Sequence, residues 1–185
     1  NTEFLYEDTI EFDSGANLQK VELVTLIQDA IFLFPERDAQ GIEETLLLGM
    51  DEEGNDIRIS GFFLADDQLN FTNEKPYVIY GFAGVASNKT LNINAGARIH
   101  FHSRSGIIVA DEGTLKVNGA LSTTEDLENE VIFEGDRLEP LYEDVSGQWA
   151  AIWLTNGSKD HEINYATIKN ASVGIIMDNN NPTSN

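Results

Sequence analysis

Two histidines stand two residues apart in the stretch "RIHFHSR", which runs from Arg98 to Arg104. Side chains two residues apart on a strand project from the same face, so His100 and His102 would lie about 7 Å apart along the backbone, a spacing that a metal ion can bridge. A carboxylate ligand would have to come from elsewhere, and Glu134 in "VIFE" is the candidate. The sequence therefore allows a metal site of His100, His102 and Glu134. The simpler interpretation, which we favour, is a pair of exposed imidazoles beside two arginines.

Carboxylates are the next residues that could do chemistry, because hydrolysis of a sugar polymer uses two of them on one face, about 5–5.5 Å or 6.5–9.5 Å apart. The predicted strands carry only Glu134, Glu162 and Asp178. The tripeptides "NTD", "GHG" and "RIK", which are typical of pectinases, are absent. We therefore name no catalytic residue and do not favour an enzyme.

Aromatic side chains could instead form a binding surface, because exposed rings stack on sugar faces and on partner proteins. Tyr142 and Trp149 lie in a long segment between predicted strands, whereas Trp153 and Tyr165, like Tyr77 and Tyr80, lie on strands. We take Tyr142, Trp149, Trp153 and Tyr165 as candidate binding residues. The alternative is that these rings only cover the side of the fold.

The acidic tip "DEEGND", from Asp51 to Asp56, raises the question of calcium. It lacks the order of alternating acidic residues and glycine that wraps a calcium ion in a helix–loop–helix site. We interpret it as a solvated hairpin turn and predict no cofactor.

The charge balance limits the partners. The chain has 11 basic and 32 acidic residues, a formal net charge of −21. Such a surface repels phosphate backbones, so we expect no nucleic-acid binding. There is no cysteine and no apolar run long enough to predict a transmembrane segment.

Short apolar runs recur along the chain in the alternating pattern of strands. "TLNI" at Thr90 and "TLKV" at Thr114 are the clearest pair, and we assign "YVIYG", "GIIV", "AAIWL" and "GIIM" to one recurring strand and "RIHF" and "VIFEG" to another. Three short strands per repeat, with no helix between them, predict a coil whose turns stack in parallel. An antiparallel sandwich is the alternative, but it would not repeat the same side-chain order.

The predicted fold class is therefore all-β: a right-handed parallel β-helix, or solenoid, preceded by antiparallel β-hairpins. We place the closing strands of a β-sandwich-like domain in residues 1–35, a hairpin linker in 36–75, and the first three or so coils of the helix in 76–185. The segment 136–149 would leave the coil as a loop, and loops of that length often carry function.

Several segments carry a resemblance to a known group: "KPYVIYGFAGV", "TLNINAGARIHFH", "SGIIVADEGTLKVNGAL", "EVIFEGDRLEPLYEDVSGQWAAIWL" and "INYATIKNASVGIIMD". They resemble right-handed parallel β-helix proteins exported by Bacteroidota, many of them surface lipoproteins. The stretch "EDTIEFDSGANLQKVELVTLIQDA" is similar to the end of the immunoglobulin-like domain that precedes the helix in that group.

The resemblance implies an exported protein at the outer membrane or cell surface, with a lipid anchor upstream of this chain. From it we expect a non-catalytic binding or structural module of the cell envelope, an accessory subunit of an outer-membrane protein complex or a protein that holds a surface glycan. The alternative is a polysaccharide-binding or polysaccharide-degrading β-helix protein.

Overall fold

The computed structural model describes residues 4–12, 19–27 and 29–178, and it divides the chain into two compact units, 1–30 and 31–185. The first unit is a hairpin of β1 (Phe4–Phe12) and β2 (Gln19–Ile27), which pair in antiparallel register. This pairing confirms the hairpin predicted for the start of the chain. Residues 13–18, which connect these two strands, lie outside the described residues.

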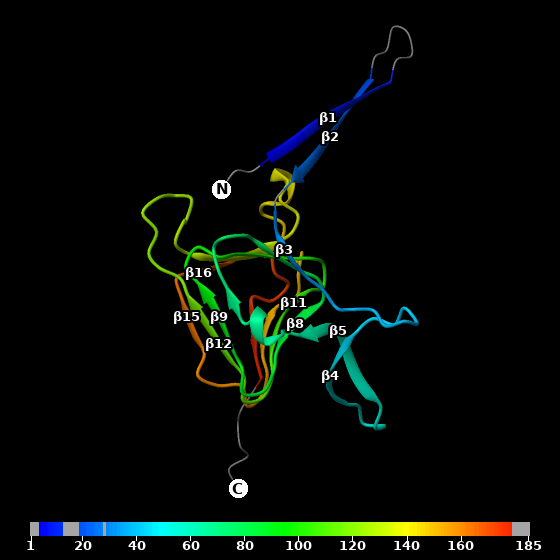
Figure 1. Ribbon diagram of the computed structural model, residues 1–185, viewed down its shortest axis with the longest axis vertical. Helices are drawn as coiled ribbons and strands as arrows, with labels where there is room; N and C mark the ends of the chain where they lie inside the picture. The colour runs from blue at the N-terminus through cyan, green and yellow to red at the C-terminus, as the bar shows by residue number, and fades with distance from the viewer. Residues whose placement is uncertain (1–3, 13–18, 28, 179–185) are drawn as a thin grey trace. The chain divides into compact units, whose positions relative to one another are not determined.

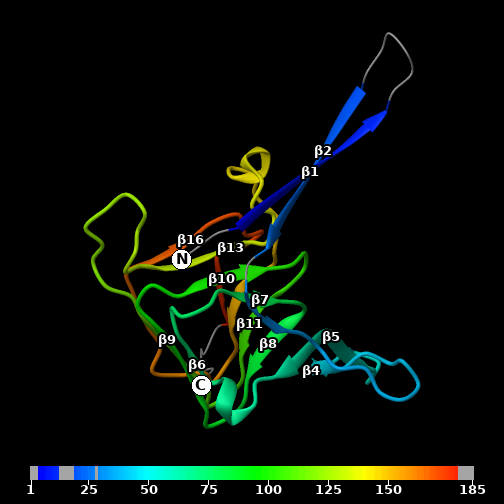
Figure 2. The same cartoon turned by 45° about the horizontal axis from the view of Figure 1, so that its top comes forward.

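The second unit is built from three parallel sheets (Figures 1 and 2). Sheet 1 contains β3 (Ile31–Leu33), β7 (Tyr77–Ile79), β10 (Arg98–Phe101), β13 (Val131–Gly135) and β16 (Ala166–Ile168). Sheet 2 contains β5 (Asp56–Phe63), β8 (Phe82–Val85), β11 (Gly106–Val109), β14 (Ile152–Leu154) and β17 (Ile175–Met177), with β4 (Thr45–Met50) as an antiparallel strand at its edge. Sheet 3 contains β6 (Asn70–Phe71), β9 (Thr90–Asn94), β12 (Thr114–Asn118) and β15 (Glu162–Asn164).

The chain visits the three sheets in turn, so each strand pairs with the equivalent strand of the next repeat. Thr90 and Leu91 of β9 pair with Thr114 and Leu115 of β12, and Ile107 of β11 pairs with Ile152 of β14. The all-β class and the parallel pairing predicted from the repeat are confirmed.

The register corrects one part of the repeat. The sequence suggested that "YVIYG" and "GIIV" are equivalent, but β7 pairs with β10, and "GIIV" in β11 pairs with β8, at Phe82 to Val85. That assignment was wrong because β8, "FAGV", has an alanine and a glycine at its centre, which hide the strand pattern, so the strand that begins at Tyr77 was taken as the equivalent of β11.

The parallel sheets also begin earlier than the boundary at residue 76. β3 pairs with β7, β5 with β8 and β6 with β9, all in parallel. The hairpin predicted within residues 36–75 is present as β4 (Thr45–Met50) and β5, which pair in antiparallel register. β5 is long enough to form the hairpin with its first half and to join sheet 2 with its second half.

The core fills the space between the three sheets with one inward side chain from every second residue. Leu91 and Leu115 from sheet 3, Ile99 and Phe133 from sheet 1, and Ile107 and Ile152 from sheet 2 are fully buried. These residues form one continuous hydrophobic cluster. Each strand therefore turns its intervening residues to the outer face of its sheet, and that is where functional side chains can stand.

The two helices in the described residues are the three-residue turns η1 (Asp66–Gln68) and η2 (Pro140–Tyr142). Neither has the length or the apolar content to cross a membrane.

Candidate functional site

The two histidines lie on the outer face of sheet 1. Ile99 and Phe101, which alternate with them, are fully buried in the core. The next repeat brings carboxylates alongside: His100 pairs in register with Glu134 of β13, and His102 lies beside Asp136. The stacking of Glu134 against His100 is the arrangement that the repeat indicated.

His102 and Asp136 form a close pair. The His102 Nδ1 atom lies 2.7 Å from Oδ2 of Asp136, and because a carboxylate only accepts hydrogen bonds, Nδ1 carries the hydrogen. In its neutral form, the ring presents Nε2 as an acceptor. The Tyr80 ring packs against the imidazole, with 4.7 Å between the ring centroids.

The predicted pair of exposed imidazoles is wrong for His100, which is buried, whereas His102 is half exposed. Only 7% of His100 is exposed, and its Nδ1 lies 3.4 Å from Oε1 of Glu134 without making a hydrogen bond. Burial lowers the pKa of His100, and the negative charge of Glu134 opposes that effect. Glu134 also forms an ion pair with Lys169, at 2.7 Å between Oε2 and Nζ.

The predicted metal site would need His100, His102 and Glu134 to lie around one ion. His100 is beside Glu134 and His102 is bound to Asp136, so the two rings serve different carboxylates. In the described part of the chain, no group of three His, Cys, Asp or Glu residues is arranged to hold a metal ion.

At the acidic hairpin tip, Asp51 accepts hydrogen bonds from the Asn55 side chain and from the backbone N–H groups of Asn55 and Glu53, and these bonds lower the pKa of Asp51. These are contacts within a turn.

A cleft opens beside His102, with a volume of about 590 Å³. Its walls come from the segment after β3, from β5, and from the two corners that follow β7 and β10. The lining residues are Phe34, Pro35, Arg37, Glu43, Ser60, Tyr80, Gly81, His102, Ser103 and Arg104. The cleft thus combines two aromatic rings with groups of both charges.

Glu43 is held firmly inside this cleft. Ser60 Oγ donates to its Oε1 at 2.5 Å, and the Arg37 guanidinium donates to its Oε2 at 3.0 Å. The hydrogen bond from Ser60 lowers the pKa of Glu43, and Arg37 adds to the effect. Glu43 is therefore a carboxylate whose two oxygens are already engaged.

Arg104 is the contrasting group. Its side chain makes no ion pair or hydrogen bond with any residue that the structure describes. Its backbone has a φ of +62°, in the left-handed region, which disfavours residues other than Gly, Asn and Asp. At the neighbouring corner of the cleft, the residue with positive φ is Gly81.

The four aromatic candidates do not share one surface. Trp149 is 1% exposed, stacks on Phe101 with ring centroids 4.3 Å apart, and donates its indole N–H to the Lys169 carbonyl, so it belongs to the core. Trp153 packs on the outer face of sheet 2 beside Phe82 and Ile108. Tyr165 is exposed at the turn between β15 and β16, and the Tyr142 ring lies under Arg137 in the loop after β13.

The sequence did not point to the cleft residues that lie in segment 34–43, at Ser60 or at the corner 103–104. A run of residues in a loop gives no periodic signal, and only the pairing of β3, β5, β7 and β10 brings these segments together. Tyr80 was noted as a strand aromatic, but its partner His102 could be found only from the register of β7 and β10.

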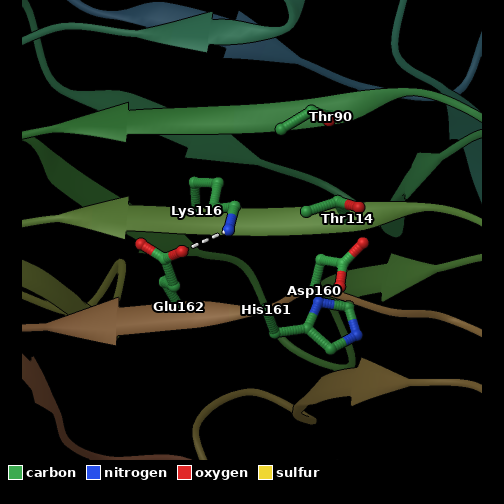
Figure 3. Close-up of a pocket in the computed structure, with 6 residues that line it drawn as sticks. All are labelled: Thr90, Thr114, Lys116, Asp160, His161 and Glu162. Atoms are coloured by element: carbon green, nitrogen blue, oxygen red, sulfur yellow. Dashed lines mark hydrogen bonds and ion pairs between the residues drawn. The ribbon is translucent and has the colours of Figure 1, made fainter.

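A second, shallower hollow of about 500 Å³ lies on the outer face of sheet 3. Figure 3 shows its lining, in which Lys116 is paired with Glu162 at 2.6 Å. Both ring nitrogens of His161 are engaged: Nδ1 accepts from the Leu115 N–H and Nε2 contacts Ser158 Oγ. With its cation and its imidazole already bound, this hollow offers a ligand less than the cleft beside His102.

Comparisons with protein-family models, with curated proteins and with solved structures found no match for this chain. The resemblance drawn from the sequence segments remains a prediction.

Proposed function

We propose that this chain is a non-catalytic binding module of the cell envelope, built on a right-handed parallel β-helix, and that the cleft beside His102 is its binding site. Three parallel sheets visited in rotation support the β-helix, and the strong preference of parallel crossover connections for the right hand supports its sense. The envelope location, the surface lipoprotein and its lipid anchor rest on the resemblance of the sequence segments.

The observation that carries the proposal is the composition of the cleft. Phe34 is 57% exposed beside a hollow that also contains the Tyr80 ring, the hydroxyl groups of Ser60 and Ser103, and charged groups. Sugars bind where an aromatic ring packs against their C–H face while polar groups hydrogen-bond their hydroxyls. We therefore take a surface glycan as the ligand.

A glycan array probed with the full chain tests this proposal. We expect binding that Phe34→Ala weakens by about tenfold or more, as for a lost aromatic contact of roughly 1.4 kcal/mol or more. Phe32→Ala is the matched control, because Phe32 is 53% exposed on the same segment but does not line the cleft. Equal loss in both variants, or binding that neither affects, would place the site elsewhere.

A polysaccharide-degrading enzyme is the second candidate, and the His102–Asp136 pair favours it. An imidazole oriented through Nδ1 leaves Nε2 available as a general base toward the cleft. Incubation of bound glycans with the protein, followed by mass spectrometry of the products, separates the two functions. Shortened products that disappear in His102→Gln would establish the enzyme, whereas intact glycans support the binding module.

A role as an accessory subunit of an outer-membrane complex draws support from the loop after β13. Leu141 is 82% exposed there, and Leu138 and Val145 are also exposed. Pull-down of the native protein from its source membranes, followed by identification of bound proteins and glycans, tests this role. Stoichiometric recovery of a membrane protein that Leu141→Ser abolishes would establish it. Recovery of glycan alone would favour the cleft.

A further inference from the structure

The charged groups that line the cleft differ in whether they already have a partner. The cleft is lined by two arginines, Arg37 and Arg104, and one carboxylate, Glu43, while His102 is already paired with Asp136. Both oxygens of Glu43 are satisfied by Ser60 and Arg37, so this carboxylate has no strong contact left for a ligand. The Arg104 guanidinium donates to no residue that the structure describes, so all its N–H groups are available to a ligand. It is a positive group beside the cleft in a chain with a net charge of −21.

A free guanidinium binds a carboxylate through two parallel hydrogen bonds, which is its strongest and most directional contact. The exposed Phe34 ring supplies a platform for a sugar face in the same cleft. On the basis of the proposed glycan-binding function, we propose that the cleft recognises an acidic saccharide, with the carboxylate of a hexuronic acid on Arg104 and the sugar ring on Phe34.

The backbone conformation at Arg104 determines which substitutions this position tolerates. A φ of +62° disfavours arginine, and glycine would adopt it without steric cost, as Gly81 does at the other corner of the cleft. The position therefore does not need arginine for the fold.

This feature also gives a variant that separates binding from folding. Arg104→Gly removes the guanidinium and at the same time releases the strained backbone, so we expect the variant to unfold at the same or a higher temperature than the parent chain. Lys89→Gln is the charge control, because it also removes one positive charge but lies away from the cleft, paired with Asp66 at 2.7 Å.

The test is isothermal titration calorimetry of the full chain with two matched pairs of ligands at fixed ionic strength. The first pair is glucuronate and glucose, and the second is a tetrasaccharide of glucuronate units and the tetrasaccharide of glucose with the same linkage. We expect at least tenfold tighter binding of the acidic member, a loss of that difference in Arg104→Gly, and no change in Lys89→Gln. Tight binding of glucuronate itself would indicate a site for a single or terminal residue, and binding of the tetrasaccharide alone would indicate an internal one.

Three results would overturn the inference. Equal binding of acidic and neutral saccharides, or an acidic preference that survives in Arg104→Gly, would show that Arg104 does not select the charge, while saccharide binding that still depends on Phe34 would leave the binding module standing. Failure of every saccharide to bind would overturn both the acidic preference and the glycan as ligand, and the pull-down from membranes would then decide whether the module binds a protein.

Discussion

His102 and Asp136 are 34 residues apart in the chain, yet the Nδ1 and Oδ2 atoms of their side chains lie 2.7 Å apart on the outer face of sheet 1. One repeat of the chain separates them, so the parallel register of β10 and β13 brings them side by side. The pair fixes the orientation of an imidazole at the edge of the cleft, and this dependence can be measured.

Asp136→Asn should change the tautomer of His102. With the carboxylate gone, the amide can donate as well as accept, and the preference for hydrogen on Nδ1 is lost. Nitrogen chemical shifts in NMR report the tautomer directly. Because the His102 side chain is half exposed, we expect a stability loss below about 1 kcal/mol in urea unfolding. Unchanged nitrogen shifts would mean that Asp136 does not orient the ring.

The burial of His100 should make stability depend on pH. Burial lowers its pKa from the ordinary value of 6.5, so the folded state takes up a proton less readily than the unfolded state. The free energy of unfolding should therefore be highest above about pH 6.5 and fall as the pH drops toward the folded pKa. Denaturant unfolding between pH 7.5 and 4.5 measures this slope. It should be smaller in His100→Gln and persist in His102→Gln; equal slopes in all three proteins would contradict the prediction.

Trp149 should be costly to remove, unlike the exposed aromatic Tyr165. It is 1% exposed, stacks on Phe101 and donates its N–H to the Lys169 carbonyl. Trp149→Ala should lower the free energy of unfolding by about 3–5 kcal/mol, the usual cost of removing a large buried side chain. Tyr165→Ala is the control, because Tyr165 is 54% exposed and its loss should cost much less. Similar small losses for both would argue against a core position for Trp149.

Two glycines, Gly106 at the start of β11 and Gly174 just before β17, form a matched pair for the close approach of neighbouring strands of sheet 2. A Cβ on Gly106 would lie 2.2 Å from the Ala151 carbonyl oxygen, whereas the nearest atom to a Cβ on Gly174 is 3.7 Å away. Each glycine directly precedes a residue that pairs with Ile152 of β14. Gly106→Ala should therefore destabilise the protein by about 1–3 kcal/mol, as overpacking does, and Gly174→Ala by much less. Thermal or urea unfolding compares the two, and equal effects would contradict the register.

Glu128 should titrate far below an ordinary glutamate. Hydrogen bonds from the Thr124 side chain and from Thr123 lower its pKa to about 2. The stabilisation that these bonds give is present above the unfolded pKa of 4.5 and is lost as the pH falls through about 2. NMR titration of the Glu128 carboxyl carbon measures this pKa. Thr124→Ala should raise it, and a value near 4.5 in the parent chain would show that the bonds do not form.

The sequence predicted the strands of the second unit well because inward and outward residues alternate with a period of two. The equivalent positions of Leu91 and Leu115 indicated the repeat, and the same repeat predicted that Glu134 lies beside His100. The pattern failed at β8, where small residues leave no alternation to read, and the strand order shifted with it.

Alternation along a strand tells which face a side chain occupies, but it does not tell which strand lies next to it. The sequence by itself therefore determined the all-β class, the parallel repeat, the outward direction of His100 and His102, and the chain's strong negative charge. Only the tertiary structure decided that Trp149 is core, that His102 binds Asp136, and that Phe34, Glu43, Tyr80 and Arg104 line one cleft. Those contacts join segments of irregular length between strands, and their positions depend on the pairing of whole sheets.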